Sequence, residues 1–300
     1  MIKEDADSGV NSKVTQLSTG KYRDTFFRKL FRDEKRILEL GNAVMGTDYP
    51  DDAKVKLCHI DPDSILARFN DIAAFIETQI IMLCEHESGL NLNMPLRILL
   101  YLSQTIYSLI DKNQLHGKKL IQIPTPKIYV LYNGKTKLKK TKLKLSDAFM
   151  IKDNAPCLEL EVEIIDINYN SGSAALAKSQ LLNGYAFLIA EINKNMDRRY
   201  PRDKAIKLAV DTCIKLGILA DFLKENYEEA YEMLDLQYSF DTEIRVREEQ
   251  AEERGEERGI EKVVLKLLKK GESDNYIIEV SGISSKRLQE LKEELLSAQL

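Results

Sequence analysis

The spacing of hydrophobic residues changes near residue 170, and this change restricts the possible folds more than any other feature of the chain. Before it, short apolar runs separated by turn residues predict β-strands. After it, apolar residues recur every three or four positions, as they do on amphipathic helices. Strands followed by a block of helices are typical of an α/β core with a helical appendage. We therefore expect a mixed central sheet flanked by helices, with an all-helical C-terminal extension.

The first part of the chain is expected to hold two long helices and several strands. One helix is predicted over Asp24–Met45, with Asp24 as its N-cap. A second begins around Pro95, after the candidate N-cap Asn93, and ends near Ile110. Strands are predicted over residues 55–60, 65–76, 80–85, 127–132 and 158–167.

The predicted domain organisation follows from the same patterns. Residues 1–20 are polar and are expected to form a disordered tail. The strand-bearing core covers 21–170, the helical extension 171–244, and a C-terminal helical segment, similar to a helix-turn-helix, 261–300. Between the last two lies a charged segment, 245–260, with like charges four residues apart and two glycines that each cost a helix about 1 kcal/mol. We expect it to be a mobile linker or a frayed helix.

Composition excludes several classes of protein. No apolar stretch approaches the length of a membrane helix, and the start of the chain carries no hydrophobic leader. Four widely separated cysteines, no CxxC pair and three histidines argue against zinc or disulfide frameworks and favour a reducing cytoplasm. The net charge of -4 argues against a general basic coat but leaves room for a local basic patch.

Acidic residues cluster in the stretch from Asn70 to Arg97. Asp71 opens one predicted strand, while Glu85 and Glu87 end the next and share one face of it. A three-residue loop centred on Thr78 pairs position 71 with position 85. A two-residue loop pairs it with position 84 instead, and a bulge is then needed to bring the carboxylates together. Either way, three acids gather at one end of an apolar hairpin.

Clustered carboxylates repel each other, and a cation relieves the repulsion. Mg²⁺ held by two carboxylates and water suits oxygen ligands of this kind. Such an ion activates a water and stabilises charge on a scissile phosphate. The alternative is that these acids only end strands at the solvent.

Several segments resemble the recombination-promoting nuclease / putative transposase family, a branch of the PD-(D/E)XK nuclease superfamily. They follow each other in the family's order and cover the chain from about Lys21 onward. The segments are DTFFRKLF (24–31), NDIAAFI (70–76), CEHESGLNLNMPLRILLY (84–101), IYVLYNG (128–134), LSDAF (145–149) and GILADFLKENYEEAYEML (217–234). The resemblance implies a PD-(D/E)XK-type fold. It also implies a Mg²⁺-dependent (or Mn²⁺-dependent) DNA endonuclease of low sequence specificity that promotes recombination or accompanies mobile elements.

The resemblance also assigns residues. Asp71 and Glu85 match the family's metal-binding acids. Asp24 matches the acid that opens the family's first helix, from which it reaches the same metal through water or serves only as the N-cap. Glu87 takes the place of the motif's Lys, where this branch often has Gln. Glu87 then acts as a third ligand or general base, or it weakens catalysis. In the second case the chain is a weak or inactive nuclease fold that binds DNA or a protein partner.

Two further regions are candidates for DNA contact. Arg97, Tyr101 and Gln104 share one face of the second helix, where Arg97 is suited to hold a phosphate; helix-to-sheet packing explains Tyr101 equally well. A basic run follows the fourth strand and suits a DNA backbone, although lysines also protect edge strands from aggregation. Its lysines are Lys135, Lys137, Lys139, Lys140, Lys142 and Lys144.

The C-terminal helices contain few basic residues. Lys286, Arg287 and Lys292 are accompanied by three glutamates, whereas a helix that reads DNA is usually more basic. We therefore expect these helices to mediate protein–protein contact or self-association rather than DNA recognition. The expected partners are DNA and a second copy of the chain, and no membrane.

Overall fold

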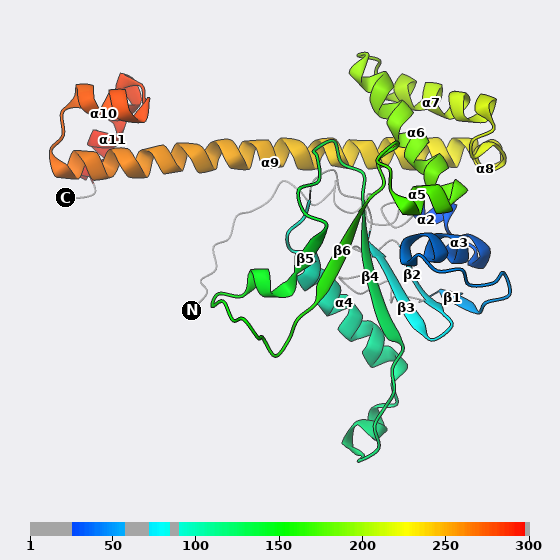
Figure 1. Cartoon of the computed structure of the whole chain (residues 1–300). Coiled ribbons are helices and arrows are strands. Elements are labelled where there is room, and N and C mark those ends of the chain that lie inside the picture. Colours follow the sequence, from blue (N-terminus) through cyan, green and yellow to red (C-terminus); the bar gives the residue numbers. More distant parts are fainter. Residues whose placement is uncertain (1–25, 58–71, 85–89, 298–300) are drawn as a thin grey trace. The chain divides into compact units, whose positions relative to one another are not determined.

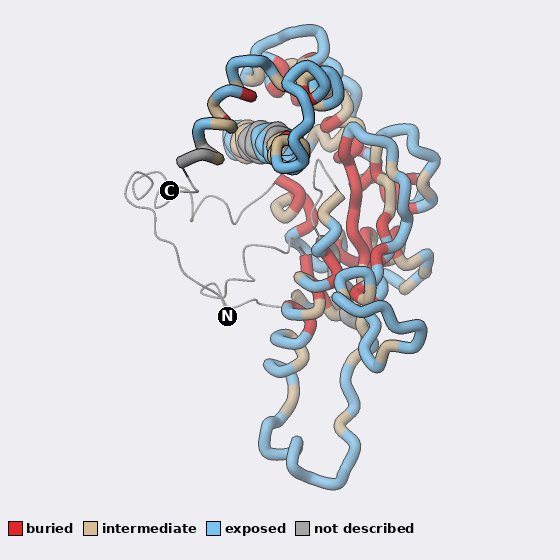
Figure 2. The backbone as a smooth tube through the Cα atoms, turned by 90° about the vertical axis from the view of Figure 1, so that its left-hand side faces the viewer, coloured by how far each residue is buried: buried red, intermediate tan, exposed pale blue. Residues whose placement is uncertain are grey.

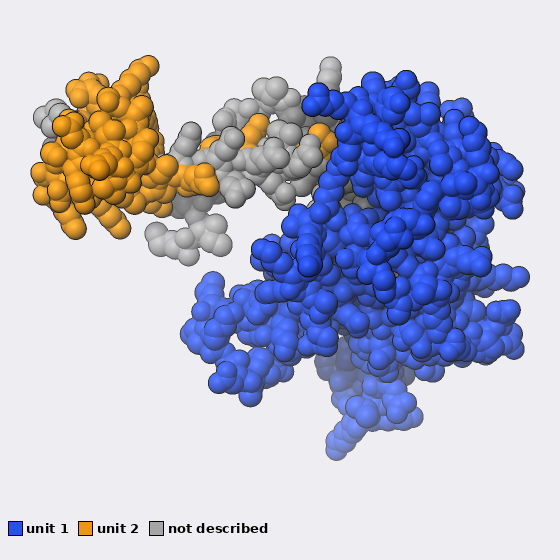
Figure 3. Space-filling model, turned by 45° about the horizontal axis from the view of Figure 1, so that its top comes forward, with its two compact units in different colours: residues 1–238 blue, residues 239–300 orange. Residues whose placement is uncertain are grey.

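The structure is a computed structural model that describes residues 26–57, 72–84 and 90–297. For residues 80–84 and for several positions of the last helices, it describes the backbone only. Two compact units are distinguished, one ending at Tyr238 and the other beginning at Ser239 (Figure 3).

Within the described residues, six strands form one mixed sheet in the order β1-β2-β3-β4-β6-β5 (Figure 1). The first three strands form an antiparallel meander, β3, β4 and β6 run parallel, and the short β5 is antiparallel to β6 at the edge. The strands are β1 (Val55–Leu57), β2 (Ile72–Ile76), β3 (Gln79–Cys84), β4 (Thr125–Tyr132), β5 (Lys142–Lys144) and β6 (Glu161–Asp166). The mixed α/β class predicted from the sequence is therefore observed, and β5 is a strand that the sequence analysis did not predict.

The first predicted helix is divided in two. Helix α2 (Phe26–Leu30) ends before Asp33, whose side chain accepts a hydrogen bond from the Arg36 backbone N–H at 3.0 Å and so begins α3 (Glu34–Met45). The apolar spacing continues across this break, which is why periodicity alone predicted one helix. The predicted N-cap Asp24 lies outside the described residues.

Helix α4 (Met94–Leu109) connects the parallel strands β3 and β4, as a crossover helix between parallel strands does. It begins at the predicted place, although Asn93 makes no side-chain capping bond and Pro95 favours the first turn instead. Short 3₁₀ turns, η3 (Lys112–His116) and η4 (Leu145–Ala148), lie in the loops that follow.

Each face of the sheet is covered by its own hydrophobic cluster, because successive side chains of a strand point to opposite faces. On β4, Val130 and Tyr132 join a cluster with Ile98 and Tyr101 of α4. Tyr129 and Leu131 join the larger cluster on the other face, which is built with α2, α3 and the later helices. The sheet is thus the middle layer of three, and the described side chains at the end of β4 and along most of β2 are buried (Figure 2).

The helical extension packs into that same larger cluster. On α6, Tyr185 stacks its ring 6.1 Å from Phe26 and meets Phe27 edge-on at 5.1 Å. Its helices therefore share a core with the sheet, and the boundary expected at residue 170 does not separate two units. The helices are α5 (Ala174–Lys178), α6 (Gln180–Asp197), α7 (Arg202–Leu216), α8 (Ala220–Glu225) and α9 (Tyr227–Lys270).

The charged segment 245–260, expected as a linker or a frayed helix, is part of the 44-residue helix α9. Most of its residues are Glu, Arg, Gln and Ala, which favour helices and offset the cost of Gly255 and Gly259. Arg254 also donates from Nε to the Gln250 carbonyl one turn earlier. Gly271, with φ 78°, follows the last residue of the helix and ends it in the left-handed region.

The second unit combines the end of α9 with α10 (Asp274–Ser281) and α11 (Ser285–Ser297). Ser273 caps α10 by accepting from the Tyr276 N–H, and Gly282 ends it in the left-handed region. Among the residues of this unit whose burial is described, Val264, Ile277, Leu288 and Leu291 form its buried cluster.

Among the described residues, no helix combines the length and the apolar composition needed to cross a membrane.

Candidate active site

The hairpin that carries the predicted acids has a two-residue turn. Ile76 pairs with Gln79 and Ile72 pairs with Leu83, so Glu77 and Thr78 form the turn. Glu77 adopts φ 53°, and its Oε1 accepts a hydrogen bond from the Lys54 N–H at 2.8 Å, which holds this turn against the segment before β1. Of the two loop lengths left open by the sequence, the described strands have the shorter one.

The predicted catalytic and metal-binding acids lie outside the described residues: Asp24, Asp71, Glu85 and Glu87. The described strands end beside them, since β2 begins at Ile72 and β3 ends at Cys84. Among the described residues, no group of three His, Cys, Asp or Glu side chains is placed to hold a metal ion. Metal binding therefore stays a prediction about those four acids.

The carboxyl ends of three described strands and the start of a fourth meet at one edge of the sheet (Figure 1). Because β3, β4 and β6 are parallel, their carboxyl ends meet at the same edge, where Cys84 pairs with Val130 and Tyr132 pairs with Asp166. The antiparallel strand β2 begins at this edge, since Ile72 pairs with Leu83. Ligands of open α/β sheets commonly bind outside the carboxyl ends of strands. We call this region the carboxyl edge.

Hydrogen bonds link the end of β6 and the segments that follow β4 and β6 at the carboxyl edge. Asn168 donates from Nδ2 to the Gly134 carbonyl at 3.1 Å and to Asp166 Oδ1 at 2.9 Å, and its backbone N–H also donates to Oδ1. Ser171 Oγ donates to the Asp166 carbonyl at 3.0 Å. These bonds hold the chain that leaves β6 against the chain that leaves β4.

Asn133, directly after β4, is buried, with 7% of its surface exposed. Its Nδ2 has no hydrogen-bond partner among the described residues. The sequence analysis missed Asn133, Asp166 and Asn168. A signal for them existed, because all three follow or end predicted strands, but only the parallel pairing places the two strand ends together.

The candidate DNA-contacting residues of α4 differ in burial. Tyr101 is 2% exposed and belongs to the core between α4 and the sheet, so packing accounts for it. Arg97 is half-buried in the first turn and Gln104 is exposed further along. The start of α4 follows β3, and its end precedes β4, so Arg97 is nearer the carboxyl edge than Gln104 is.

Most of the basic run is paired with neighbouring acids. Lys135 lies 3.0 Å from Asp197, Lys140 lies 3.8 Å from Asp147, and both Lys142 and Lys144 contact Glu161. The hydrogen bond from Lys142 lowers the pKa of the Glu161 carboxyl, and the same bond raises the pKa of Lys142.

Lys142 and Lys144 stand on β5, at the edge of the described sheet, where lysines oppose edge-to-edge pairing. Lys137 and Lys139 are exposed and have no ion pair with a described residue. They follow β4 in the loop that leaves the carboxyl edge. Lys142 and Lys144, at the end of the basic run, therefore fit the role of protecting the sheet edge from aggregation. Lys137 and Lys139, in the middle of the run, are available to a ligand.

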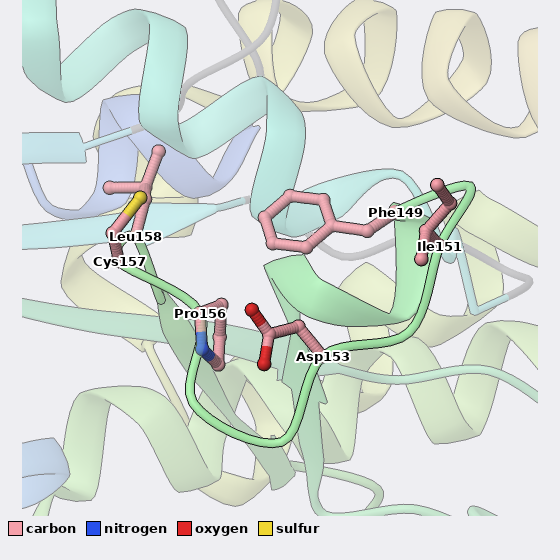
Figure 4. A pocket seen from close by; sticks show the side chains of 6 residues that line it. All are labelled: Phe149, Ile151, Asp153, Pro156, Cys157 and Leu158. Carbon is pink, nitrogen blue, oxygen red and sulfur yellow. The ribbon is translucent and has the colours of Figure 1, made fainter.

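A hollow of about 280 Å³ lies elsewhere, in the loop before β6 (Figure 4). It is lined by Phe149, Ile151, Asp153, Pro156, Cys157 and Leu158. Because the loop leads into the amino end of β6, the hollow is at the other end of that strand from the carboxyl edge. Its only charged lining residue is an acid, which does not suit a phosphate.

The basic side chains of α11 also have acidic partners. Arg287 lies 2.6 Å from Glu261 and 3.0 Å from Glu290, and Lys292 lies 2.6 Å from Asp274. Acids within the unit thus hold these two cations, whereas a helix that reads DNA presents its cations to phosphates or bases.

No family model, no curated protein and no solved structure matches this chain.

Proposed function

We propose that the chain is a metal-dependent DNA endonuclease of the PD-(D/E)XK type, with its active site at the carboxyl edge. The observation that carries the proposal is the pairing of Ile72 with Leu83. It brings the start of β2 and the end of β3 side by side, and Asp71 and Glu85 are the residues next to those strand ends in the sequence. Continued by one residue, this register would pair position 71 with position 84, so the proposal includes the bulge that a two-residue turn requires to bring the two carboxylates together.

The order and pairing of the elements support this proposal. The chain runs through α3, β1, β2, β3, α4 and β4, which is the order expected from the family resemblance. The meander of three antiparallel strands followed by a parallel strand across α4 brings all the relevant strand ends to one edge.

The proposed roles follow from the chemistry of the side chains. Asp71 and Glu85 hold Mg²⁺ or Mn²⁺, since carboxylate oxygens suit these hard ions, and Asp24 reaches the ion through water. The bound ion supplies an activated water and stabilises the charge on the phosphate that is attacked. Glu87 is either a third ligand or general base, or an acid that weakens catalysis by adding negative charge.

DNA binding in this proposal uses cations around the carboxyl edge. Arg97 begins α4 after β3, and the exposed Lys137 and Lys139 follow β4. Lys140 and Gln104 are expected to contribute less to DNA binding. Asp147 lies near Lys140 and offsets part of its charge, and Gln104 lies further along α4 than Arg97. Contacts to phosphates favour low sequence specificity, as they carry no base information.

The proposal is tested by incubating purified protein with supercoiled plasmid and Mg²⁺ or Mn²⁺, beside an EDTA control. Asp71→Ala and Glu85→Ala should each abolish nicking. The matched control is Asp52→Ala, because Asp52 is an exposed acid in the turn before β1. Nicking that survives both active-site substitutions would refute the assigned site.

The alternative is a nuclease fold that binds DNA or a protein partner without cleaving, and Glu87 is the feature that favours it. Substitution to the residues more usual at that position, Glu87→Gln and Glu87→Lys, separates the two functions. Higher activity in these variants identifies Glu87 as attenuating. No cleavage in any variant with any metal, together with retained DNA binding, establishes the binding module.

A further inference from the structure

The segment from Lys194 to Lys207 covers the end of α6, the following loop and the first turns of α7 (Figure 1). It contains six Lys or Arg residues and two acids, so its net charge is +4 in a chain whose net charge is -4. A concentration of one charge on a protein of the opposite net charge attracts ligands that complement it. The exposed cations of the segment are Lys194, Arg198, Arg199, Lys204 and Lys207.

The cations of this segment differ in whether the protein itself neutralises them. Lys194 and Arg202 have acidic partners at 2.6 Å and 2.7 Å. The side chains of Arg198 and Arg199 have no hydrogen bond or ion pair with a described residue. Lys204 is also exposed and lies over an aromatic ring, 4.9 Å from its centroid. We call Arg198, Arg199 and Lys204 the α6–α7 patch.

The turn that carries the two arginines is held by hydrogen bonds of its backbone. The Arg199 N–H donates to the Met196 carbonyl at 2.8 Å, and the Tyr200 N–H donates to the Asn195 carbonyl at 3.2 Å. Asn195 is itself buried and donates from Nδ2 to the Ala205 carbonyl. Arg199 adopts φ 64°, a conformation that glycine and asparagine reach more easily. The turn therefore does not require an arginine at this position, and the positive charge has to be explained in another way.

An ion pair places this turn beside the chain that leaves the carboxyl edge. Lys135 Nζ lies 3.0 Å from Asp197 Oδ1. Lys135 follows Gly134, whose carbonyl accepts a hydrogen bond at the carboxyl edge. The exposed Lys137 and Lys139 follow Lys135, and the α6–α7 patch begins directly after Asp197. Both groups of cations thus begin within two residues of the same ion pair.

We propose that the α6–α7 patch binds the phosphate backbone of duplex DNA that extends from the carboxyl edge, an inference that rests on the proposed nuclease function. Guanidinium groups such as those of Arg198 and Arg199 donate paired hydrogen bonds to phosphate oxygens. Helix α7 begins at the patch, and its N-cap Pro201 makes no side-chain capping bond. The amino end of α7 therefore adds positive potential beside the arginines.

The chemistry of the segment favours a duplex over a single strand. Sites for single strands combine cations with aromatic rings on which the bases stack. Tyr200 is the one aromatic residue of the segment, and the Lys204 ammonium lies over its ring. Cations are thus the main feature that this surface offers, and the phosphates of a duplex backbone are the ligand that matches them.

The first measurement is the Kd for a labelled DNA duplex, by fluorescence anisotropy with Ca²⁺ to prevent cleavage. The double variant Arg198→Gln/Arg199→Gln should bind about tenfold more weakly or worse, because hydrogen bonds to charged phosphates are lost. The matched control is Lys215→Gln/Lys224→Gln, which removes the same charge from exposed positions at the opposite end of α7 and on α8. This control should bind like the wild type. Both double variants should keep the wild-type Tm, because the replaced side chains are exposed.

The second measurement is the dependence of Kd on salt, which reports the number of phosphates that the protein neutralises. Each lost phosphate contact lowers the slope of log Kd against log salt concentration by about 0.9, so the arginine variant should lose about 2. The lysine control should retain the wild-type slope. A single strand of the same sequence, measured beside the duplex, should be affected less by the arginine substitutions.

The outcomes separate this inference from the proposed function. An unchanged Kd and salt slope in the arginine variant overturns the inference, and so does an equal loss in the lysine control, because overall charge then explains the effect. A larger loss for the single strand than for the duplex overturns the assignment to duplex DNA. Wild-type protein that binds no DNA overturns the proposed function itself. Wild type that binds and nicks DNA, beside an arginine variant that does both equally well, refutes only the role of the α6–α7 patch.

Discussion

The two compact units differ in how they bury hydrophobic residues. In the first, one cluster joins the sheet to helices from both ends of the chain, from Phe26 of α2 to Tyr238 of α9. In the second, the buried residues among those described are Val264, Ile277, Leu288 and Leu291. Small units bury a smaller fraction of their surface and gain less from the hydrophobic effect. Caps and ion pairs must therefore contribute a larger share of the stability of the second unit.

Side-chain contacts reflect the same difference. The first unit has interlocking aromatic rings at its centre, such as Phe26 with Phe222 at 5.6 Å. The second unit ties its helices together with Arg287–Glu261 and Lys292–Asp274, and it begins α10 with the Ser273 cap. The loss of stability caused by a substitution should consequently differ in size between the two units, and so should the distance over which its effect spreads.

The largest effect is expected for Leu182→Ala, in the core of the first unit. Leu182 is fully buried on α6, and the cavity left by the substitution should cost about 2–5 kcal/mol of the free energy of unfolding. Urea denaturation followed by circular dichroism measures this cost. Leu216→Ala is the control, because Leu216 is 59% exposed on α7 and should change stability by less than about 0.5 kcal/mol. Equal costs at the two positions would contradict the described packing.

Leu288→Ala should have a smaller and local effect. Leu288 is 2% exposed in the second unit, and a small core can collapse partly around the cavity, so a cost near the lower limit of about 2 kcal/mol is expected. Hydrogen exchange should accelerate in α10 and α11 and remain unchanged in α6. Equal acceleration in α6 would mean that the two units unfold together.

The sequence predicted the order of the elements better than their limits. Strands β2, β3, β4 and β6 were predicted because their apolar runs are distinct. The break between α2 and α3 was not predicted, because the apolar spacing continues across it. The break depends on one side chain, that of Asp33, which caps α3. Strand β5 was missed because Lys142–Lys144 has only one apolar residue, and it is stabilised by pairing with β6.

The candidate site was less predictable than the fold. The two-residue turn depends on the left-handed conformation of Glu77, which non-glycine residues seldom adopt and which the sequence does not signal. Asn133 and Asp166 are far apart in sequence, and only the parallel pairing of β4 with β6 places them at one edge. Strand order and local burial are properties of the whole chain rather than of a local pattern.

The first unit also contains a buried thiol, whereas the second unit has no cysteine. Burial raises the pKa of Cys213 from 9.0 to about 12. Above pH 9 the unfolded chain ionises this thiol while the folded chain does not, so stability is lost as pH rises toward the folded pKa. By about pH 10.5 the loss should be about 2 kcal/mol. Stability measured from pH 8 to about 10.5 should fall more steeply in the wild type than in Cys213→Ala, and equal slopes would exclude this contribution.

Gly184→Ala tests how tightly the first unit is packed. A Cβ at Gly184 would lie 2.9 Å from Leu219 Cγ and 3.3 Å from Ile218 Cγ2, so the backbone of α6 or these side chains must shift to accommodate it. Overpacking lowers the free energy of unfolding by about 1–3 kcal/mol, and the better helix propensity of Ala offsets about 1 kcal/mol of this loss. A net loss of about 1 kcal/mol is therefore expected.

Gly259→Ala is the matched control for this change. A Cβ at Gly259 meets no atom within 4 Å, so alanine should stabilise α9 by up to about 1 kcal/mol. Thermal denaturation of both variants measures whether each substitution lowers or raises the stability of the protein. The double variant Gly184→Ala/Leu219→Ala should lose less stability than the two single changes added together, because the close contact is removed.

The smallest effect is expected for Arg287→Gln, although it removes the main ion pairs of the second unit. Arg287 contacts Glu261 and Glu290, but its side chain is 37% exposed, and solvent screens such pairs. A loss below about 1 kcal/mol is expected, and it should shrink as salt is added. Lys286→Gln is the control, since Lys286 is exposed on the same helix. Hydrogen exchange of α10 and α11 at low and high salt measures the difference. A large, salt-independent loss would mean that Arg287 acts through packing of its aliphatic stem, and the second unit would then depend on apolar contact as much as the first does.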